Sequence, residues 1–294
     1  MQQGKLSAKT LGIILRMQQG EITEHAIYLK IASRVKDTKN RSILTNIADE
    51  EQAHCKIWEK YTEKKLKPQK GKVFWYTLLA RLFGYTFAIK LMENGEDNAA
   101  ATYDSIIDEV PEAAKIAEDE KRHEEQLIDL LDEERLQYVG SMVLGLNDAL
   151  VELTGTLAGL TFALQNTRLI ALSGLITGVS ATLSMASSEF LSARSEGRSD
   201  ALKSCVYTGI AYCITVALLV LPYLLFPEAH YLMALITMLI TVVLIIFVFT
   251  YYVSVAKGLS FKRRFSEMAF ISLGVAALSF VVGLLVKQFL GIDI

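Results

Sequence analysis

The sequence predicts an all-α protein in two parts, a four-helix bundle over residues 1–135 and a five-span transmembrane domain over residues 136–294. Charge is the first reason: 45 of the 62 charged residues lie in the first 135 positions, and only 17 lie in the remaining 159. The second reason is the helical spacing of apolar residues in the first part, and the third is the long uncharged runs in the second part. Such asymmetry indicates two regions that live in different solvents.

The first part contains four helical segments. Apolar residues recur at helical spacing over 11–35 and again over 43–61. A third helix is expected from about Trp75 to Ile107, and a fourth from Pro111 to about residue 136, since proline suits the first position of a helix. The 64–72 segment is the long connection, so two helical hairpins in an antiparallel bundle are expected.

The second part contains five apolar segments, each about as long as the roughly 20 residues that a helix needs to cross a bilayer. They are 139–164, 169–188, 205–226, 231–256 and 268–286. Buried helices of soluble proteins tend to be shorter, so such a succession indicates membrane spans.

Short loops between the spans predict the orientation. The loops after the second and fourth spans are basic, with Arg194, Arg198, Lys203, Lys257, Lys262, Arg263 and Arg264. The opposite loops hold only Arg168. By the positive-inside rule we expect the bundle in the cytoplasm and the C-terminus outside. Residues 1–10 have no apolar core, so no cleavable signal peptide is expected.

The bundle carries a pattern of metal ligands. Two Glu-x-x-His motifs lie on the second and fourth helices, and paired acids lie on the first and third. Residues three apart share a helix face, and this set is typical of a carboxylate-bridged di-iron or di-manganese centre. Carboxylates and imidazoles suit iron and manganese. The predicted ligands are Glu21, Glu24, Glu51, His54, Glu93, Glu96, Glu120 and His123.

A repeat strengthens this interpretation. Glu51 and Glu120 are 69 positions apart, as are His54 and His123, and Glu24 and Glu93. Two related hairpins would each deliver half of a dinuclear site. The repeat favours Glu24 as the first-helix ligand, but Glu21 lies one turn away on the same face and remains a candidate.

Polar residues inside the spans indicate an ion path, because an ionised side chain within a bilayer is costly. Asp148 and Glu152 lie one turn apart on the first span, and Met185 and Glu189 lie one turn apart on the second. Other interpretations stay open: Glu189 as an interfacial residue, Met185 as core packing, and Arg194 or Lys257 as a basic partner of Asp148.

Residues 11–135 resemble the rubrerythrin branch of the ferritin-like superfamily. The resemblance rests on Gly20–Glu24, the two Glu-x-x-His motifs and the Glu93/Glu96 pair. It implies a di-iron centre, with manganese as the alternative metal. Tyr28, seven residues after Glu21, resembles a tyrosine of that branch and favours Glu21. The four-cysteine rubredoxin site is missing, which argues against peroxidase activity.

The second part, from about Val139, is similar to the vacuolar iron transporter family. Asp148-Ala149 matches its first-span motif, and Met185 follows small residues as in its second span. The resemblance implies proton-coupled export of Fe(II) through a homodimer with a path between the subunits. Where plant members have an acidic metal-binding insertion, only residues 192–203 join the spans here.

The order of the two parts resembles the membrane-bound ferritin proteins of prokaryotes, which implies iron efflux across the plasma (inner) membrane. The bundle would capture, sense or oxidise iron, so ferroxidase activity is an open question. The alternatives are a membrane-anchored di-iron oxidase and a metal sensor that transports nothing. Nucleic-acid binding is not expected, because the first 135 residues hold 21 basic and 24 acidic residues, a net charge of −3.

Overall fold

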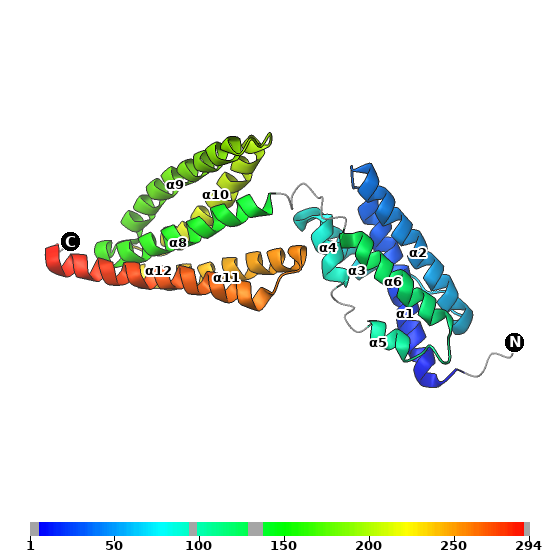
Figure 1. Ribbon diagram of the computed structural model, residues 1–294. Coiled ribbons are helices and arrows are strands. Elements are labelled where there is room, and N and C mark those ends of the chain that lie inside the picture. The colour runs from blue at the N-terminus through cyan, green and yellow to red at the C-terminus, as the bar shows by residue number, and fades with distance from the viewer. Residues whose placement is uncertain (1–5, 94–98, 129–137, 291–294) are drawn as a thin grey trace. The chain divides into compact units, whose positions relative to one another are not determined.

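A computed structural model describes residues 6–93, 99–128 and 138–290 of the protein (Figure 1). All regular structure in these ranges is helical, in eleven helices, which confirms the all-α class. The chain divides into two compact units, Met1–Glu133 and Glu134–Ile294.

The first unit is built on two long helices, α1 (Ala8–Ala32) and α2 (Thr38–Thr62), which pack side by side. The helices α3 (Lys70–Phe83), α4 (Tyr85–Glu93), α5 (Ala99–Asp104) and α6 (Glu112–Ile128) complete it. The N-terminus of α1 is capped by the Ser7 hydroxyl, which accepts a hydrogen bond from the Thr10 amide. Asp37 caps α2 in the same way, through the Asn40 amide. The structure thus confirms both long helices and begins them at Ala8 and Thr38, before the predicted starts at residues 11 and 43.

The predicted continuous helix from Trp75 to Ile107 is wrong. Helix α3 ends at Phe83, and Gly84 adopts a φ of 98°, a conformation that only glycine takes without strain. Helix α4 begins at the next residue and ends at Glu93, and α5 is a separate short helix. The helical spacing of apolar residues runs on through Gly84, so periodicity alone does not reveal the break.

The second unit consists of five long helices, all long and apolar enough to cross a membrane. They are α8 (Val139–Leu164), α9 (Thr167–Ser195), α10 (Ala201–Leu225), α11 (Tyr231–Lys257) and α12 (Phe261–Leu290). This confirms the five predicted spans, and the structure extends several of them by a few residues into the loops. Many of their leucine, isoleucine, valine and phenylalanine side chains point outward, as expected of helices that face lipid.

Helix α8 is the centre of the second unit, because it packs against each of the other four helices. Its contact with α10 is close at Gly145, where an added Cβ would lie 2.5 Å from the backbone oxygen of Thr208. A residue without a side chain is therefore required there. The Thr208 hydroxyl also donates to the backbone oxygen of Ser141, at 3.1 Å. These contacts fix the helix that carries Asp148 and Glu152.

Candidate metal centre and membrane carboxylates

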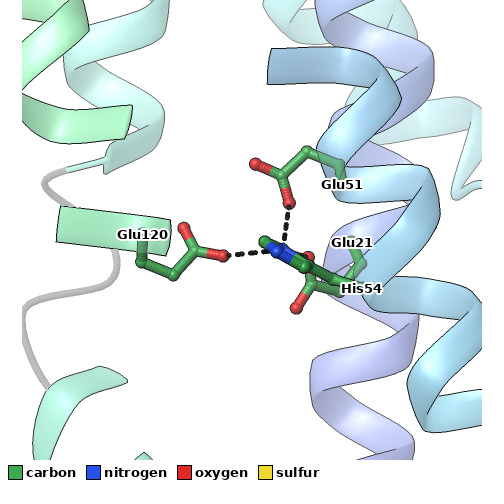
Figure 2. Close-up of side chains that lie close together, drawn as sticks. All are labelled: Glu21, Glu51, His54 and Glu120. Atoms are coloured by element: carbon green, nitrogen blue, oxygen red, sulfur yellow. Dashed lines mark ion pairs between the residues drawn. The ribbon is translucent and has the colours of Figure 1, made fainter. Parts of the chain in front are cut away.

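Three helices bring four potential metal ligands together in the first unit (Figure 2). Glu21 comes from α1, Glu51 and His54 from one face of α2, and Glu120 from α6. Each residue offers one ligand atom, and these atoms all lie within 4.8 Å of one another. Glu21, Glu51 and His54 are at most 5% exposed. Carboxylates are rarely buried so deeply without a compensating partner.

The second predicted histidine, His123 of α6, lies beside this group. Its Nδ1 is 3.1 Å from Glu51 Oε1 and 3.8 Å from Glu120 Oε2. The other oxygens of the same two carboxylates, Glu51 Oε2 and Glu120 Oε1, lie 3.7 Å and 3.3 Å from His54 Nδ1. Glu51 and Glu120 therefore each lie between the two imidazoles, whose rings stack at 5.8 Å. Carboxylates placed in this way are able to bridge two neighbouring cations.

The polar atoms that face the middle of the group lack hydrogen-bond partners. They are Glu21 Oε2, Glu51 Oε2, His54 Nδ1 and His123 Nδ1, all buried. Leaving such an atom unsatisfied costs about 1–3 kcal/mol. Bound cations would satisfy these atoms, and carboxylate oxygen with imidazole nitrogen is a donor set that suits iron or manganese. The residues present thus fit a metal ion.

Protonation balances the charges of the cluster when no cation is bound. Burial, and then Glu51, raise the pKa of Glu21 well above its ordinary value. Burial opposes ionisation of Glu51 too, but its contacts with Glu21, His123 and His54 outweigh burial and hold this pKa well below the usual range. Burial lowers the pKa of His54, yet Glu120, Glu21 and Glu51 outweigh it and raise the pKa to about 12. The pKa of His123 rises in the same way, to about 10. Binding of a cation would therefore release protons.

An outer layer of charged residues orients both imidazoles. Asp119 Oδ2 lies 3.3 Å from His54 Nε2, and Glu50 contacts His123 Nε2. Arg122 links the two acids, at 2.7 Å from Asp119 and 2.9 Å from Glu50. Such outer contacts fix the ring of a metal-binding histidine. The sequence analysis missed these residues, although an acid directly before each Glu-x-x-His motif was the signal.

The structure separates Glu21 from Glu24. Glu21 Oε1 accepts a hydrogen bond of 3.0 Å from the buried indole of Trp58, which leaves Oε2 facing the cluster. Glu24 does not belong to the group of four. It is half-buried and lines a cavity of about 210 Å³ whose walls also include Glu21 and Glu120. The role of Trp58 was also missed, and its position one turn after His54 was the available signal.

The remaining predicted ligands belong to the third predicted helix. Glu93 ends α4, and its Oε1 accepts a hydrogen bond of 2.5 Å from the buried hydroxyl of Tyr28. Burial, and then the charges of Glu93, Glu51 and Glu24, raise the pKa of Tyr28 well above its ordinary value. Glu96 lies outside the described residues.

Two carboxylates lie on the outer side of α8 in the membrane unit. Asp148 and Glu152 are both exposed in the single chain, although they lie within the first candidate span. The Tyr212 hydroxyl of α10 donates to Glu152 Oε2 at 2.7 Å. Among the described residues, no lysine or arginine forms an ion pair with Asp148, so the basic partner considered for it is not found.

Glu189 of α9 is held by its neighbours. It accepts hydrogen bonds from Ser141 of α8, at 3.0 Å, and from Ser204 of α10, while Arg198 lies 3.9 Å away. Its side chain is 11% exposed. Because Glu189 of α9 accepts from α8 and α10, it links three helices. Met185, one turn earlier, is partly buried and packs against the apolar core of the unit. Through Ser141 and Ser204, Glu189 contacts α8, which carries Asp148 and Glu152, and α10, whose Tyr212 contacts Glu152.

Comparison with known proteins gives one assignment. Neither the curated proteins nor the solved structures yield a match. Residues 139–201, which cover α8, α9 and the first residue of α10, match the family model described as the VIT family. This segment of the chain is therefore similar to the VIT (vacuolar iron transporter) family, and this match, with the five candidate spans, indicates an integral membrane protein that transports metal ions.

Proposed function

We propose that the protein exports Fe(II) from the cytoplasm in exchange for protons, with Mn(II) as the alternative cargo. In this proposal the first unit is a ferritin-like module that captures the metal. The observation that carries the proposal is the pair Asp148 and Glu152, exposed on an apolar helix inside the segment that matches the VIT family. Carboxylates at such a place are costly unless they serve an ion path.

The exposure of this pair supports a homodimer. Facing lipid, two carboxylates one turn apart would both be desolvated, which is unfavourable. A second copy of the chain that covers this side of α8 would enclose them between the two subunits. The pair would then line a path at the subunit interface, with carboxylate oxygens as ligands for a divalent cation.

Protons have defined places to bind in such a path. Asp148 and Glu152 lie four residues apart on one helix, and a proton on either would relieve the repulsion between them when the cation leaves. Tyr212 donates to one oxygen of Glu152, which orients the other oxygen. In this proposal, inward protons would neutralise these carboxylates when the cation leaves and so return the carrier to its starting state.

The first unit is proposed to hold iron, or manganese, at Glu21, Glu51, His54, Glu120 and His123. A bound Fe(II) would supply an exchangeable cation and, with dioxygen, one-electron oxidation chemistry. The residues of the chain hold the ligand atoms in place: Trp58 fixes Glu21, and Asp119 and Glu50 orient the two imidazoles. Such a centre is suited to capture of the cation.

The proposal is tested by metal flux in proteoliposomes with an imposed pH gradient. Fe(II), Mn(II) and Zn(II) are compared for the wild type, Asp148→Asn and Glu267→Gln. Glu267 is a matched control because it is a carboxylate on α12, 47% exposed and paired with Arg263. We expect Fe(II) flux that depends on the gradient, is lost in Asp148→Asn and persists in Glu267→Gln.

Absence of flux in the wild type, with metal still bound by the first unit, would overturn the proposal. That result would favour the membrane-anchored oxidase or the sensor. Oxygen consumption in the presence of Fe(II) then distinguishes these two, because only an oxidase consumes oxygen. Flux that is unchanged in Asp148→Asn would leave a transporter but remove the carboxylate path.

A further inference from the structure

Helix α3 exposes large apolar side chains on one face. Phe74, Trp75 and Leu82 are 66%, 55% and 59% exposed, and Leu78 is half-buried between them. Positions 74, 78 and 82 are spaced four apart, so with Trp75 they form a continuous apolar stripe along the helix. We call these four residues the outer face of α3. Contiguous apolar surface of this kind marks a site of interaction.

The outer face is not needed for the core of the first unit. The rest of the helix circumference includes Val73, Thr77 and Leu79, which are buried, and α3 packs against α1. The helix thus has one face that belongs to the core and a second apolar face that the described residues of the unit leave uncovered. Phe74, Trp75 and Leu82 of this second face are thus exposed to the surroundings of the unit.

Charge around α3 identifies the chemistry of that partner. Residues 64–92 contain no aspartate or glutamate and seven basic residues: Lys64, Lys65, Lys67, Lys70, Lys72, Arg81 and Lys90. The rest of the first 135 residues then holds 14 basic and 24 acidic residues, from totals of 21 and 24. A strongly basic stretch within an acidic unit fits an anionic partner.

The basic residues of α3 flank the apolar stripe. At 100° per residue, Lys70 and Arg81 fall on one side of the Phe74–Leu78 line and Lys72 on the other side of Trp75. A tryptophan and phenylalanine face bordered by lysine and arginine is the pattern of a helix that lies in the interface of a membrane. Anionic headgroups attract such basic residues.

We propose that the outer face of α3 binds the surface of a bilayer that contains anionic phospholipids. The same chain crosses a membrane, so this unit is always tethered close to a bilayer, which raises the effective concentration of lipid at α3. A second copy is a poorer partner, because a two-fold contact would bring the like-charged lysines and arginines of both copies together.

Tryptophan fluorescence of the full-length protein tests this directly. The chain has two tryptophans, Trp58 and Trp75, and neither lies in the spans. Trp58 is fully buried, whereas Trp75 belongs to the outer face of α3. Wild type and Trp75→Phe are reconstituted in vesicles of phosphatidylcholine and phosphatidylglycerol, with ordinary or brominated acyl chains. The difference between the two proteins is the emission of Trp75. We expect brominated chains to quench this emission by roughly half or more, as for an interfacial tryptophan.

A variant without the basic residues of α3, and a matched control variant, test whether these charges contribute to membrane binding. The variant Lys70→Gln/Lys72→Gln/Arg81→Gln is expected to lose most of the quenching in these vesicles. The matched variant Lys56→Gln/Lys60→Gln, on α2, is expected to keep it. Both are checked for unchanged helix content by circular dichroism, since all five positions are on helices.

Three results would overturn the proposal. Quenching of Trp75 by aqueous acrylamide and not by brominated lipid would place the outer face in water. Protection from both quenchers would mean that protein covers it, either a second copy or another part of the chain. Equal quenching in the triple variant and its control would remove the role of anionic lipid. None of these depends on whether metal is transported.

Discussion

Glu21 has surroundings that set it apart from the other acids of α1. One oxygen is held by Trp58, and the other is buried and faces Glu51 and His54 without a hydrogen-bond partner. Glu24, three residues later, lies at the wall of the neighbouring cavity instead. A single turn of helix thus separates Glu21, which is suited to ligate a cation, from Glu24, which lines the neighbouring cavity.

The two acids are expected to respond differently to loss of charge. Glu21→Gln removes the negative charge of a buried carboxylate ligand. We therefore expect the affinity of the protein for Mn(II) to fall by at least about 10–100-fold, the range that is typical even of outer residues. Glu24→Gln is expected to change the affinity by less than about threefold, since it lies outside the group of four. Titration of Mn(II) followed by electron paramagnetic resonance measures both. A larger loss in Glu24→Gln would reverse the assignment.

Protons should compete with the cation at His54 and His123. Their pKa values of about 12 and about 10 lie above the ordinary 6.5, so the metal-free protein keeps these protons across neutral pH. Their favourable contribution to the metal-free fold is complete below pH 6.5 and is lost as the pH rises through the raised values. Metal must displace these protons, so affinity for Mn(II) should increase with pH.

The expected size is on the order of tenfold per pH unit for each proton displaced, over about pH 6.5 to about pH 8. Titrations of Mn(II) at the two ends of this range measure it. The variant Asp119→Asn serves as a comparison, because it weakens the pairing of His54 without removing a ligand. An affinity that does not change with pH would show that neither imidazole is protonated in the metal-free protein.

At the scale of the helix, the position of Asp148 depends on how closely α8 approaches α10. Gly145→Ala would place a methyl group 2.5 Å from the backbone oxygen of Thr208, which cannot rotate away. We expect a loss of about 1–3 kcal/mol in stability, as for other overpacked sites, and reduced metal flux because Asp148 lies three residues along the same helix. Gly140→Ala is the control, since nothing lies within 4 Å of its added Cβ. Thermal unfolding of both variants in detergent measures the difference, and equal midpoints would contradict it.

Helices differ in how much of them the sequence could predict. The spans follow from long apolar runs, and the two long helices of the first unit from the spacing of apolar residues, so the presence of these helices was predicted correctly. The break at Gly84 was not, because a glycine within a periodic pattern can continue a helix or end it. The ligand on α1 was left open because the 69-residue repeat aligns Glu24 with Glu93, whereas the packing of Trp58 against Glu21 arises only in three dimensions.

At the scale of the whole molecule, one chain joins a unit that can hold a cation to a unit that belongs to a membrane. The first unit keeps its candidate ligands buried and unsatisfied, and the second keeps two carboxylates exposed on a central helix. Covalent linkage gives the two units a high effective concentration relative to each other, which in the proposed function would favour transfer of the cation from the first unit to the second. Capture should therefore matter most when the metal is scarce.

This reasoning predicts how flux depends on Fe(II) concentration when the first unit is disabled. Glu21→Gln/Glu51→Gln removes two buried ligands and leaves the spans unchanged, so we expect the Fe(II) concentration for half-maximal flux to rise several-fold. The maximal flux should stay within about twofold of the wild type. Capture by the first unit affects how readily Fe(II) reaches the transmembrane path, and it does not affect the rate at which Fe(II) passes through that path. Glu118→Gln, a neighbouring acid outside the group of four, is the control. Proteoliposome flux over a range of Fe(II) concentrations separates the two parameters. Loss of maximal flux would instead make the first unit an obligatory step of transport, and no change in either parameter would make it independent of transport.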